Sequence, residues 1–338
     1  PAIRLAHLTD AQRRAYVIAD NKLAENAGWD MATLAREVED LNADGYDLEL
    51  LGFGADELTA LLGEYGKDAA KPGDGLTDPD EAPAVQATPV TKLGDVWVMG
   101  KHRLMCGDST SLEAVKALTL GGGVDMVFTD PPYGISIVKG GKVGGCSLAK
   151  TGTYAPVAGD DTIKVAVDAI QVIATLGAKV EIIWGGNYYA NSLPNTSCWI
   201  VWDKRDEMAG NNFADCELAW TNQDTAVRKF AHTWSGMIKA SEHGKKRVHP
   251  TQKPVALAAW CFDKYGAECK TVLDIFGGSG STLIACEQHN KTGYIMELAE
   301  PYVDVIVRRW QSFTGKQATL ESTGQTFEQV QEQRLSNA

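Results

Sequence analysis

Short apolar runs alternate with helix-length segments through most of the chain, and this alternation constrains the fold more than any other feature. The runs Val124–Phe128, Val180–Trp184 and Thr271–Ile275 are each bounded by polar residues or glycine. The segments Asp161–Leu176 and Pro254–Tyr265 are long enough to form helices. Strands that alternate with helices are typical of an α/β fold with a mainly parallel sheet. Further apolar runs of the same kind are Val96–Met99, Arg103–Cys106, Trp199–Trp202 and Glu217–Trp220.

The chain before residue 92 has a different texture, which predicts a division into parts. Residues 1–65 are expected to form a small helical segment, because apolar residues recur there at helical spacing. These residues are Leu34, Ala35, Val38 and Leu41. Residues 66–91 contain several Pro, Gly and Asp and few large apolar side chains, which predicts a linker. The α/β domain is then expected at 92–316, followed by a C-terminal tail at 317–338.

The formal net charge is −12, which by itself argues against a nucleic-acid partner. The acidic residues are concentrated in residues 1–95, which hold 8 Lys and Arg against 19 Asp and Glu. The other 24 basic and 25 acidic residues leave the larger part of the chain almost neutral. Local basic clusters in that part can therefore still bind phosphates.

Two further features exclude other classes of protein. No uninterrupted stretch of about 18 apolar residues is present, so we expect no transmembrane helix. The chain is accordingly expected in the cytoplasm. The seven cysteines are scattered and form no Cys-x-x-Cys pair, a pattern typical of reduced thiols that predicts neither a disulfide framework nor a metal site.

The first motif that carries chemistry follows the apolar run Val124–Phe128. It reads Thr-Asp-Pro-Pro-Tyr-Gly, with Asp130, Pro131, Pro132 and Tyr133 at its centre. Ligands of open α/β sheets bind beyond the carboxyl ends of the strands. Two consecutive prolines make the turn stiff and leave carbonyls free to accept, so a carboxylate and a rigid carbonyl can clamp an amino group. The tyrosine offers a flat face to a planar base, although an ordinary turn after a strand explains the same residues.

The second motif is a glycine-rich turn between the strand Thr271–Leu273 and a helix expected at Leu283–His289. This geometry brings backbone close to a nucleotide-like ligand. Glu297 ends the next apolar run and is well placed for ribose hydroxyls, or else is a surface carboxylate. No lysine follows the glycines, which argues against a P-loop. The candidate cofactor residues in the turn are Asp274, Phe276, Gly277, Gly278, Ser279, Gly280, Ser281 and Thr282.

Together, the two motifs resemble those of the DNA amino-methyltransferases, which act on adenine N6 or cytosine N4. The catalytic motif precedes the cofactor motif here, as in the permuted β group of that family. The resemblance covers most of residues 92–312 and includes Leu104–Ser109, His249–Pro254 and a closing helix at Tyr302–Trp310. It implies a Rossmann-like S-adenosylmethionine-dependent methyltransferase fold that is circularly permuted.

The resemblance adds two residues to the expected cofactor site. Asp108 is expected near the adenine of S-adenosylmethionine, with a helix N-cap as the alternative. Lys253 belongs to the segment that precedes the cofactor turn in the family. Part of the N-terminal helical segment, residues 11–65, resembles the later half of a ParB/sulfiredoxin-like domain, which is often joined to such enzymes in phage and mobile elements. No site residue is carried over from that domain, and a helical recognition or packing appendage is the expectation.

The function that the resemblance implies is site-specific, adenine-specific DNA methylation, as in restriction-modification, with S-adenosylmethionine as methyl donor. Family members with Asp before Pro-Pro tend to act on adenine and those with Ser on cytosine, so Asp130 favours adenine. The target base is expected to be flipped out and stacked on Tyr133. Members of the β group are often dimers, so the resemblance allows a homodimer and leaves the oligomeric state open. Cytosine N4, RNA or a protein amide stay open as substrates, as does a non-catalytic ParB-like DNA-binding adaptor.

Basic residues in two segments are candidates for DNA binding. The loop 136–160 and the stretch 203–249 lie where target recognition is expected, although solvated surface loops explain them equally. The candidates are Lys139, Lys142, Arg205, Lys245, Lys246 and Arg247.

Overall fold

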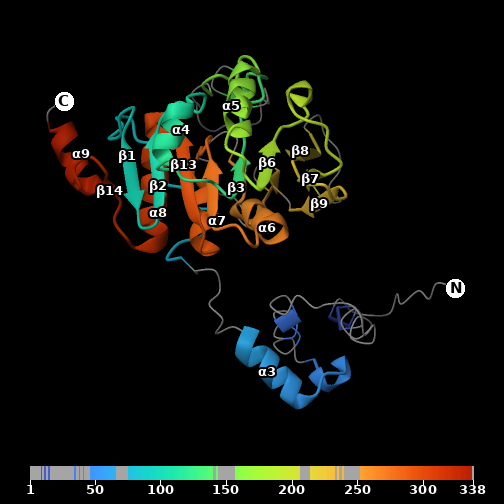
Figure 1. Ribbon diagram of the computed structural model, residues 1–338. Coiled ribbons are helices and arrows are strands. Elements are labelled where there is room, and N and C mark those ends of the chain that lie inside the picture. The colour runs from blue at the N-terminus through green and yellow to red at the C-terminus, as the bar shows by residue number, and fades with distance from the viewer. Residues whose placement is uncertain are drawn as a thin grey trace. The chain divides into compact units, whose positions relative to one another are not determined.

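The computed structural model describes residues 46–65, 75–139, 142–143, 157–205, 214–232, 234–235, 238–239 and 252–336, together with nine scattered positions between 9 and 41. The chain divides into two units, Pro1–Gly73 and Asp74–Ala338 (Figure 1). The larger unit holds both motifs.

Most of the described positions of the smaller unit are helical, as predicted. Its elements include the 3-10 helix η1 (Leu48–Leu51) and the helix α3 (Ala55–Tyr65). The four apolar residues that recur at helical spacing are all buried, and they share a core with Leu51 and Leu61.

A ten-stranded sheet organises the larger unit, in the order β14-β1-β2-β13-β12-β3-β6-β8-β7-β9. The strands on one side and in the middle are β1 (Val96–Met99), β2 (His102–Cys106), β13 (Thr292–Glu297), β12 (Thr271–Asp274), β3 (Met126–Thr129) and β6 (Val180–Trp184). The remaining strands are β7 (Trp199–Asp203), β8 (Cys216–Thr221), β9 (Arg228–Ala231) and β14 (Thr319–Leu320). Two short pairs stand apart: β4 (Val138–Lys139) with β5 (Lys142–Val143), and β10 (Trp234–Ser235) with β11 (Ile238–Lys239).

The centre of the sheet is parallel, as the alternation predicts: β2, β13, β12, β3 and β6 all run the same way. Counted from the strand before the glycine-rich turn, their order is 3-2-1-4-5, the doubly wound Rossmann-like arrangement. The chain enters at the third of these strands and supplies the first two at its C-terminal end, so the predicted permutation is confirmed. The pairs β1 with β2 and β6 with β8 are antiparallel, so the sheet is mixed at both sides.

Helices cover both faces of the sheet (Figure 1). On one face, α4 (Leu112–Leu118) and α5 (Lys164–Ala174) pack against the side chains of Val127, Leu273 and Met296. The other face carries α6 (Val255–Tyr265), α7 (Ser281–Gln288) and α8 (Glu300–Thr314). Alternate residues of each strand point to opposite faces, so both faces are apolar and bury a core.

The linker predicted at 66–91 is wrong for residues 75–91, which pack on the larger unit; residues 66–74 lie outside the described residues. Asp80 is 3% exposed and its carboxylate accepts from the backbone N–H of Val255 at 2.7 Å. The N–H groups of Val90 and Thr91 donate to Asp304 at 2.6 and 3.0 Å. Large apolar residues are scarce here because buried hydrogen bonds attach the segment.

The tail predicted at 317–338 is also wrong, since residues to 336 are part of the same unit. Strand β14 pairs with β1, and α9 (Phe327–Leu335) begins with a capping box between Thr326 and Gln329. Phe327 and Val330 are 1% exposed and join the core beside Trp97. An aromatic contact at 5.2 Å between the rings of Trp97 and Phe327 fixes the segment on the sheet.

Candidate active site

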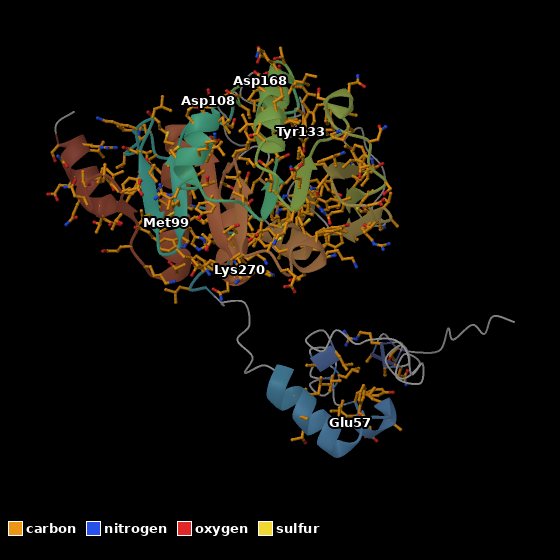
Figure 2. All side chains as sticks on the ribbon, in the orientation of Figure 1. Glu57, Met99, Asp108, Tyr133, Asp168 and Lys270 are labelled. Atoms are coloured by element: carbon orange, nitrogen blue, oxygen red, sulfur yellow. The ribbon has the colours of Figure 1, made fainter. Side chains whose placement is uncertain are left out.

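The two motifs meet at the carboxyl edge of the parallel strands. Figure 2 shows Asp108 and Tyr133 on one side of the larger unit and Met99 and Lys270 on the opposite side. The strand order reverses between β12 and β3, and ligands of doubly wound sheets bind at such a switch point. The hydroxyl of Thr129, at the end of β3, donates to Asp274 at the end of β12 over 2.9 Å. This bond ties the Pro-Pro turn to the glycine-rich turn.

Asp274 anchors the glycine-rich turn from within. Its carboxylate accepts from Thr129, from the N–H of Phe276 at 3.1 Å and from the hydroxyl of Thr282 at 2.6 Å. Burial raises the pKa of Asp274 to about 6, against the lowering effect of these bonds. The side chain therefore braces the turn, and its proposed contact with a cofactor stays a prediction.

Glu297 lies at the tip of β13 and faces the same turn. One carboxylate oxygen accepts from the N–H of Gly278 and the other from the N–H of Ala299, each at 2.8 Å. Burial raises the pKa of this carboxyl to about 7, although the backbone bonds oppose the shift.

The glycines make the tight turn possible. Gly278 and Gly280 have φ of 54° and 85°, in the region that favours glycine. A Cβ on Gly277 would lie 2.5 Å from a side-chain carbon of Ile295, so the turn packs directly on β13. Behind the turn, Arg309 donates to the carbonyl of Ser279 at 2.8 Å.

Asp108 is exposed at the end of β2, where its carboxylate accepts from the N–H and hydroxyl of Thr110 at 2.9 and 2.7 Å. The alternative role as helix N-cap is wrong, because Ser111 caps α4 and accepts from the N–H of Ala114.

The Asp130 carboxylate sits in a network of charged groups. The hydroxyl of Tyr133 donates to one of its oxygens at 2.8 Å, and the ammonium of Lys253 pairs with the other. Burial raises the pKa of Asp130, and the nearby ammonium opposes the shift. Sequence reasoning assigned Lys253 to the cofactor, but the structure places its ammonium on the catalytic motif. Only its backbone carbonyl reaches the glycine-rich turn, where the Ser281 hydroxyl donates to it at 2.7 Å.

Two residues that sequence reasoning missed complete this network. Glu217, on β8, approaches the ammonium of Lys253 at 3.1 Å and that of Lys204 at 2.8 Å. Burial opposes ionisation of Glu217, but the two lysines lower its pKa to about 2. The signal was a single acidic residue inside an otherwise apolar strand, since a buried charge requires a partner.

Aromatic rings line the mouth of the Pro-Pro turn. Tyr188 stacks on Tyr133 with 4.8 Å between ring centroids and 16° between planes. A Cβ on Gly185 would lie 2.1 Å from the Tyr133 ring, so only glycine fits under it. Tyr188 is 42% exposed and was not predicted. One face of Tyr133, the expected stacking surface for a base, is therefore covered by another aromatic ring.

Asp160 fixes the backbone that follows the motif. Its carboxylate accepts from the N–H groups of Gly134 and Ile137 at 2.9 and 2.7 Å, and it is 4% exposed. Asp160 thus fixes the backbone of Gly134 and Ile137 directly after the motif. These contacts join residues that are far apart in the sequence, as the Lys253–Asp130 pair does.

The structure describes the side chain of only one of the six predicted DNA-binding residues, Arg205. Lys139 and Lys142 oppose each other across the β4–β5 pair, and their side chains lie outside the described residues. Lys245, Lys246 and Arg247 also lie outside them. Arg205 is 4% exposed and pairs with Asp215 at 3.1 Å, a position that does not suit a phosphate contact.

Two segments of the chain match family models. Residues 32–93 match the ParB-methyltransferase HTH domain, and residues 191–308 match the DNA methylase family of N6/N4 methyltransferases. The chain is a DNA methyltransferase of the N6/N4 class. The methyltransferase uses S-adenosylmethionine, and the resemblance of its N-terminal part to ParB-like domains is confirmed. The HTH match extends past the boundary at residue 73 and includes the segment that packs on the catalytic unit.

Several solved structures are similar to the methyltransferase, and three of them have the following sequence identity, coverage and TM-score. The M1.HpyAVI–SAM complex is 19% identical, covers 61% of this chain and 97% of its own, and has a TM-score of 0.39. TTHA0409 of Thermus thermophilus, complexed with S-adenosyl-L-methionine, is 15% identical over 62% of this chain and 95% of its own, with a TM-score of 0.38. The cytosine-N4-specific PvuII DNA methyltransferase is 13% identical over 75% and 94%, with a TM-score of 0.40.

The chemistry of the cofactor side suits S-adenosylmethionine. Two carboxylates, Asp108 and Glu297, lie at the ends of the adjacent strands β2 and β13 and can accept from amino and hydroxyl groups. The glycine-rich turn brings backbone to the same edge without a lysine of its own, which fits a nucleoside sulfonium better than a polyphosphate. Among the described residues there is no metal-binding cluster and no helix long and apolar enough to cross a membrane.

Proposed function

We propose that the methyltransferase transfers the methyl group of S-adenosylmethionine to the N6 amino group of adenine in DNA. The observation that carries this proposal is the place of Asp130 and the Pro-Pro turn at the strand-order switch, tied to the cofactor turn through Thr129 and Asp274. The resemblance of Asp130-Pro131-Pro132-Tyr133 to the adenine-type motif supports adenine over cytosine.

The residues of the site suit an amine that is a poor nucleophile. The nitrogen lone pair of an exocyclic amine is conjugated with the ring, so the site must recruit it. Asp130 and the carbonyl beside Pro131 accept its two hydrogens and favour tetrahedral nitrogen, and the carboxylate stabilises the positive charge that grows there. S-adenosylmethionine supplies the electrophilic methyl group, and holding both reactants in line provides much of the rate.

The target base must leave the DNA helix to reach Asp130, so base flipping is part of the proposal. The exposed face of Tyr188 offers an aromatic surface for the flipped base, and a base that stacks on Tyr133 itself must first displace Tyr188.

The decisive experiment identifies the methylated base. Unmethylated DNA is incubated with the protein and S-adenosylmethionine labelled in the methyl group, then hydrolysed to nucleosides. We expect label in N6-methyldeoxyadenosine. Label in N4-methyldeoxycytidine would correct the base but keep the class of enzyme, whereas label in RNA or protein with none in DNA would refute the proposal.

A further inference from the structure

Lys253 pairs through its ammonium with the Asp130 carboxylate, the group that the target amine needs as an acceptor. Its ammonium contacts three acceptors: the Asp130 carboxylate, Glu217 at 3.1 Å and the Tyr133 hydroxyl at 3.3 Å. An ammonium has three hydrogens, so all of its donors are satisfied in this arrangement. Its side chain is 12% exposed, and it lies 5.9 Å from the centre of the Trp184 ring.

This arrangement suits the resting protein but opposes the reaction. A cation against Asp130 keeps that carboxylate ionised in a buried place. The same cation repels the positive charge that develops on the target nitrogen during transfer, and like charges at contact distance interact strongly where water is excluded. The chemistry therefore favours a state in which the ammonium has moved away from Asp130.

Glu217 provides the second position for the ammonium. Its carboxylate is a permanent anion, since Lys253 and Lys204 lower its pKa to about 2. It already contacts Lys253, so a small rotation of the lysine side chain exchanges one carboxylate for the other without leaving a buried cation unpaired. Lys204 holds the other oxygen of Glu217 and fixes the acceptor in place.

We propose that Lys253 and Glu217 are positioning residues for methyl transfer: Lys253 moves from Asp130 to Glu217 when the target amine binds. Lys253 acts through Asp130, and Glu217 acts through Lys253. The proposal rests on the proposed function, because it requires that an amine donates to Asp130.

The test compares E217Q, K253Q and the double variant in single-turnover methylation of a DNA that the wild-type protein methylates. In E217Q the ammonium has no anionic partner other than Asp130, so we expect kcat to fall about tenfold or more while the Kd for S-adenosylmethionine stays unchanged. The double variant removes the obstruction itself. At the alkaline end of the pH profile, where ionisation of Asp130 depends least on a neighbouring cation, the double variant is expected to turn over faster than E217Q.

The pH profile supplies an independent readout. The charged and titratable groups around Asp130 are Lys253, Glu217, Tyr133, Asp274 and Tyr189. Loss of the Lys253 charge raises the pKa of Asp130, so the acid limb of kcat in K253Q is expected to move to higher pH. The control K316Q breaks an exposed ion pair with Glu287 of 2.9 Å at the amino edge of the sheet and is expected to keep the wild-type profile.

The outcomes separate the two proposals. A wild-type protein that methylates no DNA refutes the proposed function. An active wild-type protein with a double variant no faster than E217Q, or with an unshifted acid limb in K253Q, overturns the role of Lys253 and Glu217 alone. If E217Q does not fold, the pH profile of kcat in K253Q alone tests the role of Lys253.

Discussion

The two halves of the site satisfy buried carboxylates in different ways. On the cofactor side, Glu297 and Asp274 accept from backbone N–H groups and hydroxyls of the adjacent turn. On the catalytic side, Asp130 and Glu217 are held by lysines from distant parts of the chain. Burial raises the pKa of Glu297 to about 7 and that of Asp274 to about 6, because no cation among the described residues compensates the burial. The catalytic side holds two carboxylates and two ammonium groups, whose charges cancel. A side chain can therefore change partner within this network without creating a net buried charge.

The largest effect is expected from removing the segment that supports Lys253. Deletion of residues 1–90 removes Asp80, which binds the N–H of Val255 and, through its carbonyl, the side chain of Gln252. Each buried group left unsatisfied costs about 1–3 kcal/mol, against a total stability of about 5–15 kcal/mol. We expect an insoluble or inactive product, contrary to the linker prediction from the sequence.

The matched control is deletion of residues 1–73, which ends at the unit boundary and is expected to leave a folded, active methyltransferase. Solubility, thermal unfolding and methyl transfer measure both proteins. Equal activity of the two truncations would mean that residues 74–90 do not position the catalytic side. The shorter deletion removes 7 basic and 14 acidic residues, so nonspecific DNA affinity at low salt is expected to rise slightly.

The catalytic side alone is tested by D130A. The substitution removes the proposed acceptor of the target amine, so methyl transfer is expected to fall about 10²- to 10³-fold or more. The Kd for S-adenosylmethionine, measured by calorimetry, should stay nearly unchanged because the glycine-rich turn is intact. Wild-type turnover would exclude Asp130 from the mechanism, and a large loss of cofactor affinity would show that the two halves are coupled.

The cofactor side alone is tested by E297A. We place the ribose hydroxyls on this carboxylate, and charge-assisted hydrogen bonds contribute about 1.5–3 kcal/mol. The expected loss of affinity is roughly tenfold or more. Since Glu297 also accepts from Gly278, some of the loss will come from a less ordered turn. Calorimetry with unchanged affinity would contradict this placement.

The raised pKa of Glu297 predicts a pH dependence on the cofactor side. Hydroxyl donors favour the ionised carboxylate, so S-adenosylmethionine binding is expected to be full above the pKa of about 7 and to weaken as the pH falls below it. The linkage relation gives about a tenfold change in Kd between pH 8 and pH 6. E297Q should bind more weakly but without this dependence. A dependence that survives in E297Q would point instead to Asp274, whose pKa is about 6.

The smallest effect is expected from Y133F. The ring keeps its stacking on Tyr188, and only the hydroxyl that donates to Asp130 is lost. A hydrogen bond contributes about 0.5–1.5 kcal/mol, which corresponds to a decrease in kcat of roughly three- to tenfold. Steady-state kinetics measures it. A loss as large as that of D130A would mean that the hydroxyl, not the ring, is the essential part of Tyr133.

The sequence by itself predicted the α/β architecture and, through the order of its two motifs and the family that they resemble, the permuted strand order. The architecture follows from a local pattern, short apolar runs that are buried on both faces of the sheet. The tight turn after Asp274 follows from its glycines. Contacts within the glycine-rich turn link residues that are close in the chain, such as Asp274 with Phe276 and Thr282. The nine residues from Asp274 to Thr282 therefore contain most of the information that shapes this turn.

Only the tertiary structure decided the catalytic network and the true extent of the domain. Lys253 meets Asp130 across 123 positions, and Asp80 meets Val255 across 175. Neither pair leaves a periodic signal, because ion pairs and single buried hydrogen bonds depend on which loops the sheet brings together. The burial of Arg205, a predicted DNA-binding residue, and the packing of residues 75–91, part of the linker predicted at 66–91, escaped the sequence for the same reason: polar residues are buried where another part of the chain satisfies them.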